Sequence, residues 1–136
     1  MSKRHGFTLM ELTIVLGLLA ILAAILVPLF LRTTDRARLR SDIQSARVIQ
    51  NAMDLYRLER GRAVAGANME ERVENLVAAD YINPRNTEPQ TYGAAWVLDG
   101  GIVKVCINDV QDDNVHAVAY NLSGDERDMV IGVASS

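Results

Sequence analysis

Residues 12–31 read LTIVLGLLAILAAILVPLFL, and Thr13 carries the only polar side chain in this run. As an α-helix the segment is about 30 Å long, which is the thickness of the hydrocarbon core of a bilayer. A chain of 136 residues cannot build a domain that surrounds a helix apolar on every face. The segment therefore predicts a membrane-spanning helix rather than the buried helix of a soluble protein.

The composition excludes several classes of function. The chain has two His and one Cys, too few for a disulfide framework or a Cys-rich zinc site. Its 14 Lys and Arg stand against 17 Asp and Glu, and a net charge of −3 argues against direct nucleic-acid binding. No nucleophile, base and orienting group occur at a recognisable spacing, so the sequence predicts neither an enzyme nor a bound cofactor.

A short basic segment precedes the apolar run. It contains Lys3, Arg4 and His5, and the positive-inside rule predicts that this end stays in the cytoplasm while the chain after Leu31 crosses the inner membrane. Residues 28–32 offer no small-residue cleavage site of the ordinary secretory type. We therefore expect the apolar segment to remain in the mature protein, with its amino end inside and its carboxyl end outside.

One acid stands at the mouth of the apolar run. Residues 6–12 read GFTLMEL, and Glu11 is the acid. At membrane depth a carboxylate must be protonated, lie near the headgroups or pair with a cation. The alternative interpretation is an acid in the first turn of a helix that stays at the interface and is stabilised by the macrodipole.

The basic leader followed by GFTLMEL resembles the prepilin (class III) signal shared by type IV pilins and type II secretion pseudopilins. This resemblance implies that prepilin peptidase cleaves between Gly6 and Phe7 and methylates the new amino terminus of Phe7. It also implies that Glu11 attracts the amino terminus of a neighbouring subunit, so that assembly neutralises both charges and sets the register. A glycine before the cut lets an extended backbone enter the peptidase cleft without a side-chain clash.

Two helix-weakening residues interrupt the apolar run. Pro28 lacks a backbone N–H and clashes with the carbonyl four residues before it, so we expect a kink or loosening over residues 24–28. Gly17 weakens the helix nearer its start. The resemblance implies that the stretch from Gly17 to Pro28 partly unwinds when helices pack into a fibre; the alternative is a transmembrane proline without effect.

The helical period continues beyond the membrane segment. Apolar residues recur at intervals of three or four, which predicts one helix that ends at Arg60 with Gly61 as its cap. The first half is apolar all round, whereas the second has a single apolar stripe and is expected to pack against a small head. The stripe comprises Leu39, Ile43, Ala46, Ile49, Met53 and Tyr56.

Charge is distributed unevenly between this stem and the head. Residues 32–62 contain eight Arg and four acids, whereas residues 63–136 contain four basic residues and twelve acids. Three interpretations remain open for the arginines closest to the membrane: contact with phospholipid headgroups, a solvated helix face, or attraction to the acidic head of another subunit. These arginines are Arg32, Arg36, Arg38 and Arg40.

The head begins with a helix and continues with strand patterns. Asn68 opens a helix over residues 69–79, and Glu71 completes a capping box. Strand patterns cover 94–98, 102–107, 115–120 and 129–133, with turns at 99–101 and 123–125, which predicts four antiparallel strands. In the second strand we expect Val103, Val105 and Ile107 to face the stem, and Lys104 and Cys106 to share the other face. A lone cysteine cannot form the intrachain bridge that the resemblance associates with many type IV pilins.

An acidic segment follows the second strand pattern. Residues 108–114 include Asp109, Asp112 and Asp113, whose hard oxygen ligands suit calcium outside the cytoplasm. A solvated turn is the other interpretation, because the spacing is not that of an EF-hand. His116 is expected to be a surface residue without a catalytic role.

Together these patterns predict an α+β protein in which a long transmembrane and stem helix packs on a small antiparallel sheet, which is the pilin fold. Its segments are a leader (1–6), a membrane and filament-core helix (7–31), an amphipathic stem (32–62) and a head (63–136). We expect a structural subunit of a type IV pilus-like filament. Its partners would be copies of itself, other pilins, prepilin peptidase and an inner-membrane assembly platform. The alternatives are a type II secretion pseudopilin, a competence pilin and a membrane-anchored binding module that does not polymerise.

Overall fold

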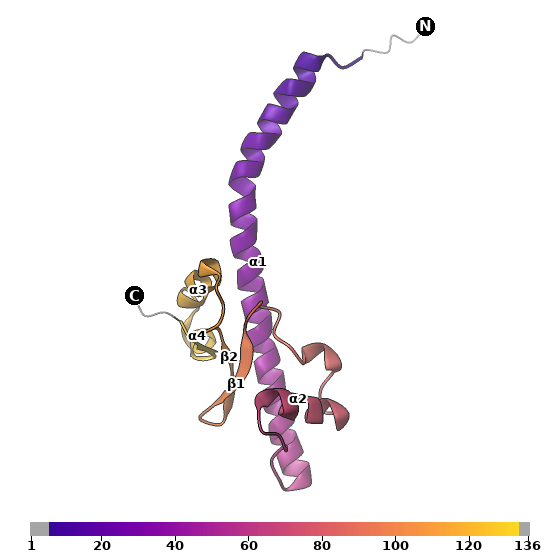
Figure 1. The fold of residues 1–136 in the computed structure, drawn as a ribbon, viewed down its shortest axis with the longest axis vertical. Coiled ribbons are helices and arrows are strands. Elements are labelled where there is room, and N and C mark those ends of the chain that lie inside the picture. The colour runs from indigo at the N-terminus through magenta and orange to yellow at the C-terminus, as the bar shows by residue number, and fades with distance from the viewer. Residues whose placement is uncertain (1–5, 134–136) are drawn as a thin grey trace. The chain divides into compact units, whose positions relative to one another are not determined.

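The computed structural model describes residues 6–133, shown in Figure 1. Its longest element is helix α1, Leu9–Arg60, and the chain divides into two compact units between Thr33 and Thr34. The basic leader at residues 3–5, on which the predicted orientation depends, lies outside the described residues. Each unit is described by itself below.

In the first unit, α1 runs unbroken through Gly17 and Pro28, and every side chain from residue 6 to residue 33 is exposed. α1 is long and apolar enough to cross a membrane, and none of its most apolar window is buried. The Thr13 hydroxyl donates a hydrogen bond to the Leu9 carbonyl at 2.8 Å. The apolar run at residues 12–31 therefore satisfies its one polar side chain internally, as a segment without access to water requires.

In the second unit, α1 buries one face. Its buried residues, at spacings of one, three or four, are Leu39, Asp42, Ile43, Ala46, Ile49 and Ala52. The helix ends at Arg60, as predicted, because Gly61 adopts a φ of +65° and its N–H donates to the Arg57 carbonyl at 3.0 Å. Figure 1 shows β1 and β2 beside this half of α1.

The sheet has three strands: β1 Ala95–Asp99, β2 Ile102–Cys106 and β3 Val130–Ile131, in the order β1-β2-β3. β1 and β2 are antiparallel, with Trp96 opposite Val105, and the turn between them contains Gly100 and Gly101 at φ of 59° and 87°. The predicted facing is confirmed, because Val103, Val105 and Ile107 are fully buried. These three side chains form the core with the buried face of α1.

The prediction of four antiparallel strands was wrong in two respects. Residues 115–120 lie within helix α3, Asp113–Tyr120, and the predicted turn at 123–125 begins helix α4, Gly124–Asp128. The short apolar run at residues 115–120 fits a strand as well as a helix, and Val115 and Ala119, four residues apart, are the buried pair of a helix. β3 then pairs parallel to β2, which the helical connection between them permits. The α+β class is nevertheless confirmed.

Helix α2, Met69–Ala78, begins as predicted with Asn68, whose side chain accepts from the Glu71 N–H at 2.8 Å. The Glu71 carboxylate accepts from the Ala67 N–H instead of from the cap residue itself. At its other end, Asp80 adopts a φ of 63°, and the Tyr81 N–H donates to the Leu76 carbonyl at 2.9 Å. This is a Schellman end with aspartate in the left-handed position that glycine usually occupies.

Tyr81, the residue that follows Asp80, connects the end of α2 to the last turn of α1. The Tyr56 and Tyr81 rings meet edge to face at 5.2 Å between centroids, and the Arg60 guanidinium lies 5.8 Å from the Tyr56 centroid. The Tyr81 hydroxyl donates to the Glu59 carboxylate. Its hydrogen bond with Arg60 raises the pKa of that guanidinium further above its already high value, so Arg60 stays charged at any physiological pH.

Candidate assembly and processing site

The start of α1 is a capping box formed by Thr8 and Glu11. The Thr8 hydroxyl oxygen accepts from the Glu11 N–H at 3.2 Å. In return, the Glu11 Oε2 atom accepts from the Thr8 N–H at 2.9 Å and from the Thr8 hydroxyl at 3.1 Å. In the single chain, the carboxylate therefore compensates orphan donors of its own helix. Both interpretations of Glu11 agree with this geometry, because one oxygen is bound locally while the side chain remains exposed.

The predicted cleavage point lies immediately before this box. Phe7 is 86% exposed, and a Cβ built on Gly6 meets nothing within 4 Å. The packing of the described chain therefore does not require glycine at this position.

The other predicted glycine is also free of packing constraints. A Cβ on Gly17 meets nothing within 4 Å, and the helix continues through Gly17 and Pro28 without interruption. The expected unwinding of this stretch in a fibre stays a prediction.

The arginines at the start of the stem differ in the acids that they contact. Arg40 Nη2 lies 3.2 Å from the Glu126 carboxylate on α4, so this arginine binds an acid of its own chain. Arg38 Nη1 lies 4.0 Å from the Asp35 carboxylate one turn away. Arg36 is exposed and has no hydrogen bond or ion pair within residues 6–133.

The aspartates of the acidic segment have different structural environments. Asp112 caps α3 by accepting from the Asn114 N–H at 2.9 Å, and Asp113 lies in the first turn of that helix. Asp109 and Asp112 line a cavity of about 740 Å³ together with Asp35 of α1. Across residues 6–133, no group of three or more His, Cys, Asp or Glu is arranged to hold a metal ion.

His116 is more buried than the sequence suggested. It is half-buried on α3, and its Nε2 lies 2.8 Å from the Val110 carbonyl oxygen. The contact positions the segment before α3 against that helix. The expectation of a surface histidine was therefore wrong.

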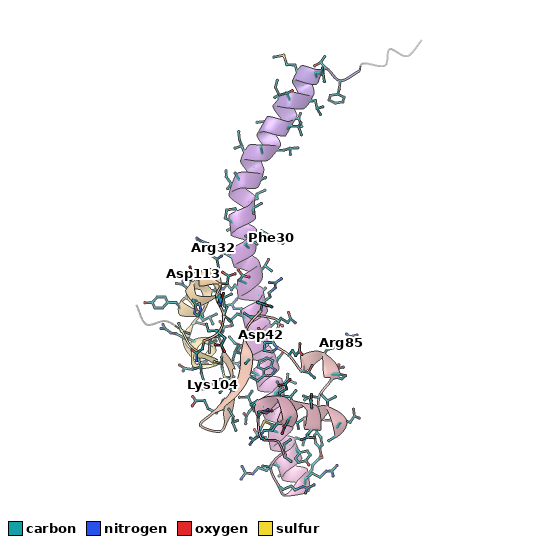
Figure 2. All side chains as sticks on the ribbon, viewed as in Figure 1. Phe30, Arg32, Asp42, Arg85, Lys104 and Asp113 are labelled. Carbon is teal, nitrogen blue, oxygen red and sulfur yellow. The ribbon has the colours of Figure 1, made fainter. Side chains whose placement is uncertain are left out.

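Asp42 is the residue that the sequence reasoning missed. It is 1% exposed, and its two carboxylate oxygens accept from the Gln90 N–H at 2.6 Å and the Thr91 N–H at 2.9 Å. Figure 2 labels it on α1, from which it holds the loop that leads to β1. The signal was present in the sequence, because Asp42 falls on the apolar stripe between Leu39 and Ala46, where a charge must find buried partners.

Comparisons with known proteins agree with the motif at the start of α1. The family described as "Prokaryotic N-terminal methylation motif" matches residues 1–27. The chain is 31% identical over 104 residues to the type II secretion system core protein G of Vibrio cholerae, covering 76% of this chain and 63% of that protein. It is 31% identical over 106 residues to the protein of the same name from Aeromonas hydrophila, covering 76% and 66%.

A further similarity covers a shorter part of the chain. The chain is 39% identical over 61 residues to prepilin peptidase-dependent protein D of Escherichia coli, covering 45% of this chain and 42% of that protein. The chain thus spans less than two thirds of the length of these relatives. No solved structure matches it significantly.

Proposed function

We propose that this chain, which belongs to the family of type IV pilins and type II secretion pseudopilins, is a structural filament subunit of the type II secretion kind. The family consists of structural subunits rather than enzymes. The observation that carries the proposal is the Thr8 and Glu11 capping box at the start of the apolar, exposed first half of α1. From the sequence we expected a pilus subunit, whereas the names of the relatives favour a pseudopilus subunit.

Processing is the first step of the proposed function. Prepilin peptidase cleaves between Gly6 and Phe7 on the cytoplasmic side and methylates the Phe7 amino group. The motif matched over residues 1–27 supports this step. The apolar half of α1 then anchors the subunit in the inner membrane, with the second unit outside the cytoplasm.

Assembly is the second step. On an inner-membrane platform, Glu11 of one subunit pairs with the Phe7 amino terminus of its neighbour, and the apolar helices pack into the filament core. The exposed apolar side chains of the first unit support this step, because such a surface must be covered by lipid or by other helices. The pairing sets the register of the subunits, since a buried ion pair adds little net stability.

Intact mass spectrometry of the protein from its native membrane tests the processing step. We expect a mass that lacks residues 1–6 and carries one added methyl group. A subunit that keeps its first six residues and remains a single membrane protein would contradict the proposal. In that case a membrane-anchored binding module is favoured, and substitution of Gly6 should leave its function intact.

Deletion of the gene distinguishes the kinds of filament. Loss of exoprotein release identifies a pseudopilus, whereas loss of a fibre that shearing recovers from wild-type cells identifies a pilus, and loss of DNA uptake identifies a competence filament. Glu11→Leu tests the assembly step and should abolish entry into filaments. Thr13→Leu is the matched control, because the Thr13 hydroxyl bonds only to its own helix; equal assembly of the two variants would refute the role of Glu11.

A further inference from the structure

The second half of α1 has an exposed face that nothing in the described chain covers. Its residues follow spacings of four and three along the side opposite the buried core, and three of them are large and apolar. Val48 is 43% exposed, Leu55 is 46% exposed and Leu58 is 82% exposed. We call this surface the α1 outer face; it comprises Gln44, Val48, Asn51, Leu55 and Leu58. A repeat of this kind is typical of a helix face that packs against another element.

The edge of the α1 outer face is basic beside Val48, whereas the exposed Asp54 lies two turns further along the same edge. Arg36 and Arg47 are eleven residues apart, which is about three helical turns, so they lie on the same side of α1. Both are exposed, and within residues 6–133 neither takes part in a hydrogen bond or an ion pair. Pairing of this face with a second α1 outer face would place arginines against a surface of the same sign. The face is therefore suited to an acidic partner.

The same unit carries a complementary surface on α2. Glu70 and Glu74 are exposed one turn apart, and residue 78 of the same row is alanine. Like charges at this spacing repel each other, and no cation of the described chain compensates them. We call this row the α2 outer face. The opposite side of α2 packs into the core through Met69, Val73 and Leu76.

We propose that the α1 outer face of one copy binds the α2 outer face of the next copy. The carboxylates of Glu70 and Glu74 pair with Arg47, while their aliphatic stems and Ala78 cover Val48 and Leu55. The two rows have matching lengths, because eight residues of α2 span about 12 Å and seven residues of α1 span about 10.5 Å. Charge complementarity and the exposed apolar row favour a second copy as the occupant.

The contact joins two different surfaces of the same chain. Such a heterologous contact does not close on itself in a dimer, and its repetition produces an open helical assembly. The inference deepens the proposed filament function and rests on it, because it assigns the contact made by the second unit outside the membrane.

Cysteine crosslinking in cells that make the full chain tests this contact. In a Cys106→Ser background, Val48→Cys and Ala78→Cys are produced on separate copies, together and singly, and treated with a short bis-maleimide. We expect a crosslinked pair only when both variants are present. A control pair of Val48→Cys with Arg85→Cys should not crosslink, since Arg85 is exposed on the short helix η1, Pro84–Asn86 (Figure 2).

Each other outcome overturns the proposal. A crosslink from Val48→Cys alone would mean that the α1 outer face pairs with itself. Absence of the mixed crosslink in cells whose filaments are recovered would refute the contact while leaving the proposed function intact. Absence of filaments from the wild-type chain would instead refute the proposed function.

Charge reversal tests the electrostatic part. Arg47→Glu alone and Glu70→Arg with Glu74→Arg should each reduce the mixed crosslink about fivefold or more, which is the effect of about 1 kcal/mol. Combining all three substitutions in one chain should restore it to within about twofold, because complementarity returns with the signs exchanged. Arg85→Glu is the matched control and should leave the yield unchanged. No restoration in the combined variant would refute the pairing.

Discussion

Asp42 anchors the loop before β1 to α1, and its replacement by alanine should be strongly destabilising. The substitution removes a buried carboxylate that accepts two backbone N–H groups, at 2.6 and 2.9 Å, and leaves the Thr91 N–H buried without a partner. A hydrogen bond to a charged group contributes about 1.5–3 kcal/mol. Because the two bonds share one acceptor group, we expect a total loss of about 3 kcal/mol in the free energy of unfolding.

The fluorescence of Trp96 reports this change directly. Trp96 is the only tryptophan of the chain, it is buried, and its indole N–H donates to the Thr87 carbonyl in the same loop at 3.1 Å. For a unit of this size, a loss of about 3 kcal/mol lowers the melting temperature by roughly 12–24 °C. The thermal melt is measured on the full chain in detergent micelles. Because Trp96 belongs to the second unit, its fluorescence reports the unfolding of that unit.

Two variants of α1 complete the experiment. Asp42→Asn keeps one acceptor oxygen and should lose about half as much stability as Asp42→Ala. Asp54→Ala is the matched control, because Asp54 is exposed and contacts only the amide of Gln50, and its melt should stay within about 2 °C of wild type. If Asp42→Ala melted together with Asp54→Ala, the anchoring role would be refuted.

Three further substitutions test local features of the fold. Asp80→Gly should raise the free energy of unfolding by about 1 kcal/mol, because Asp80 occupies a left-handed position at φ 63°, whereas Asp80→Ala should give no gain in a urea titration. Gly132→Ala should lower stability by about 2 kcal/mol or more, since the new Cβ would lie 2.3 Å from Asn108 Oδ1 at a residue with φ of 92°; an unchanged urea midpoint would contradict this. Thr8→Val should remove the capping box with Glu11 and destabilise the start of α1 by about 1 kcal/mol. The measurement is amide hydrogen exchange in micelles, which should become faster over the first turn of α1. Thr8→Ser is the control, and its exchange rates should equal those of the wild type.

The local pattern of the chain was enough to predict α1, whereas the cleavage and pairing sites near its start stay predictions. An apolar run of this length, a basic leader and a single acid are properties of consecutive residues, so no distant contact is needed to interpret them. The end at Arg60 was predicted for the same reason, because Gly61 acts within one helical turn. The facing of β2 also followed from alternation alone.

Long-range packing determined the features of the fold that the local pattern did not predict. Residues 115–120 form a short apolar run that fits a strand as well as a helix, yet Val115 and Ala119 enter the core from a helix, and β3 pairs parallel to β2. The loop before β1 is held by Asp42, 48 and 49 residues away along the chain, through partners that no local pattern identifies. The sequence by itself determined the apolar run, the long helix α1 and the start of α2, because these depend on neighbours along the chain. Only the tertiary structure decided strand direction, the buried anchor and the two unpartnered outer faces, because these depend on which distant surfaces remain after the core has formed.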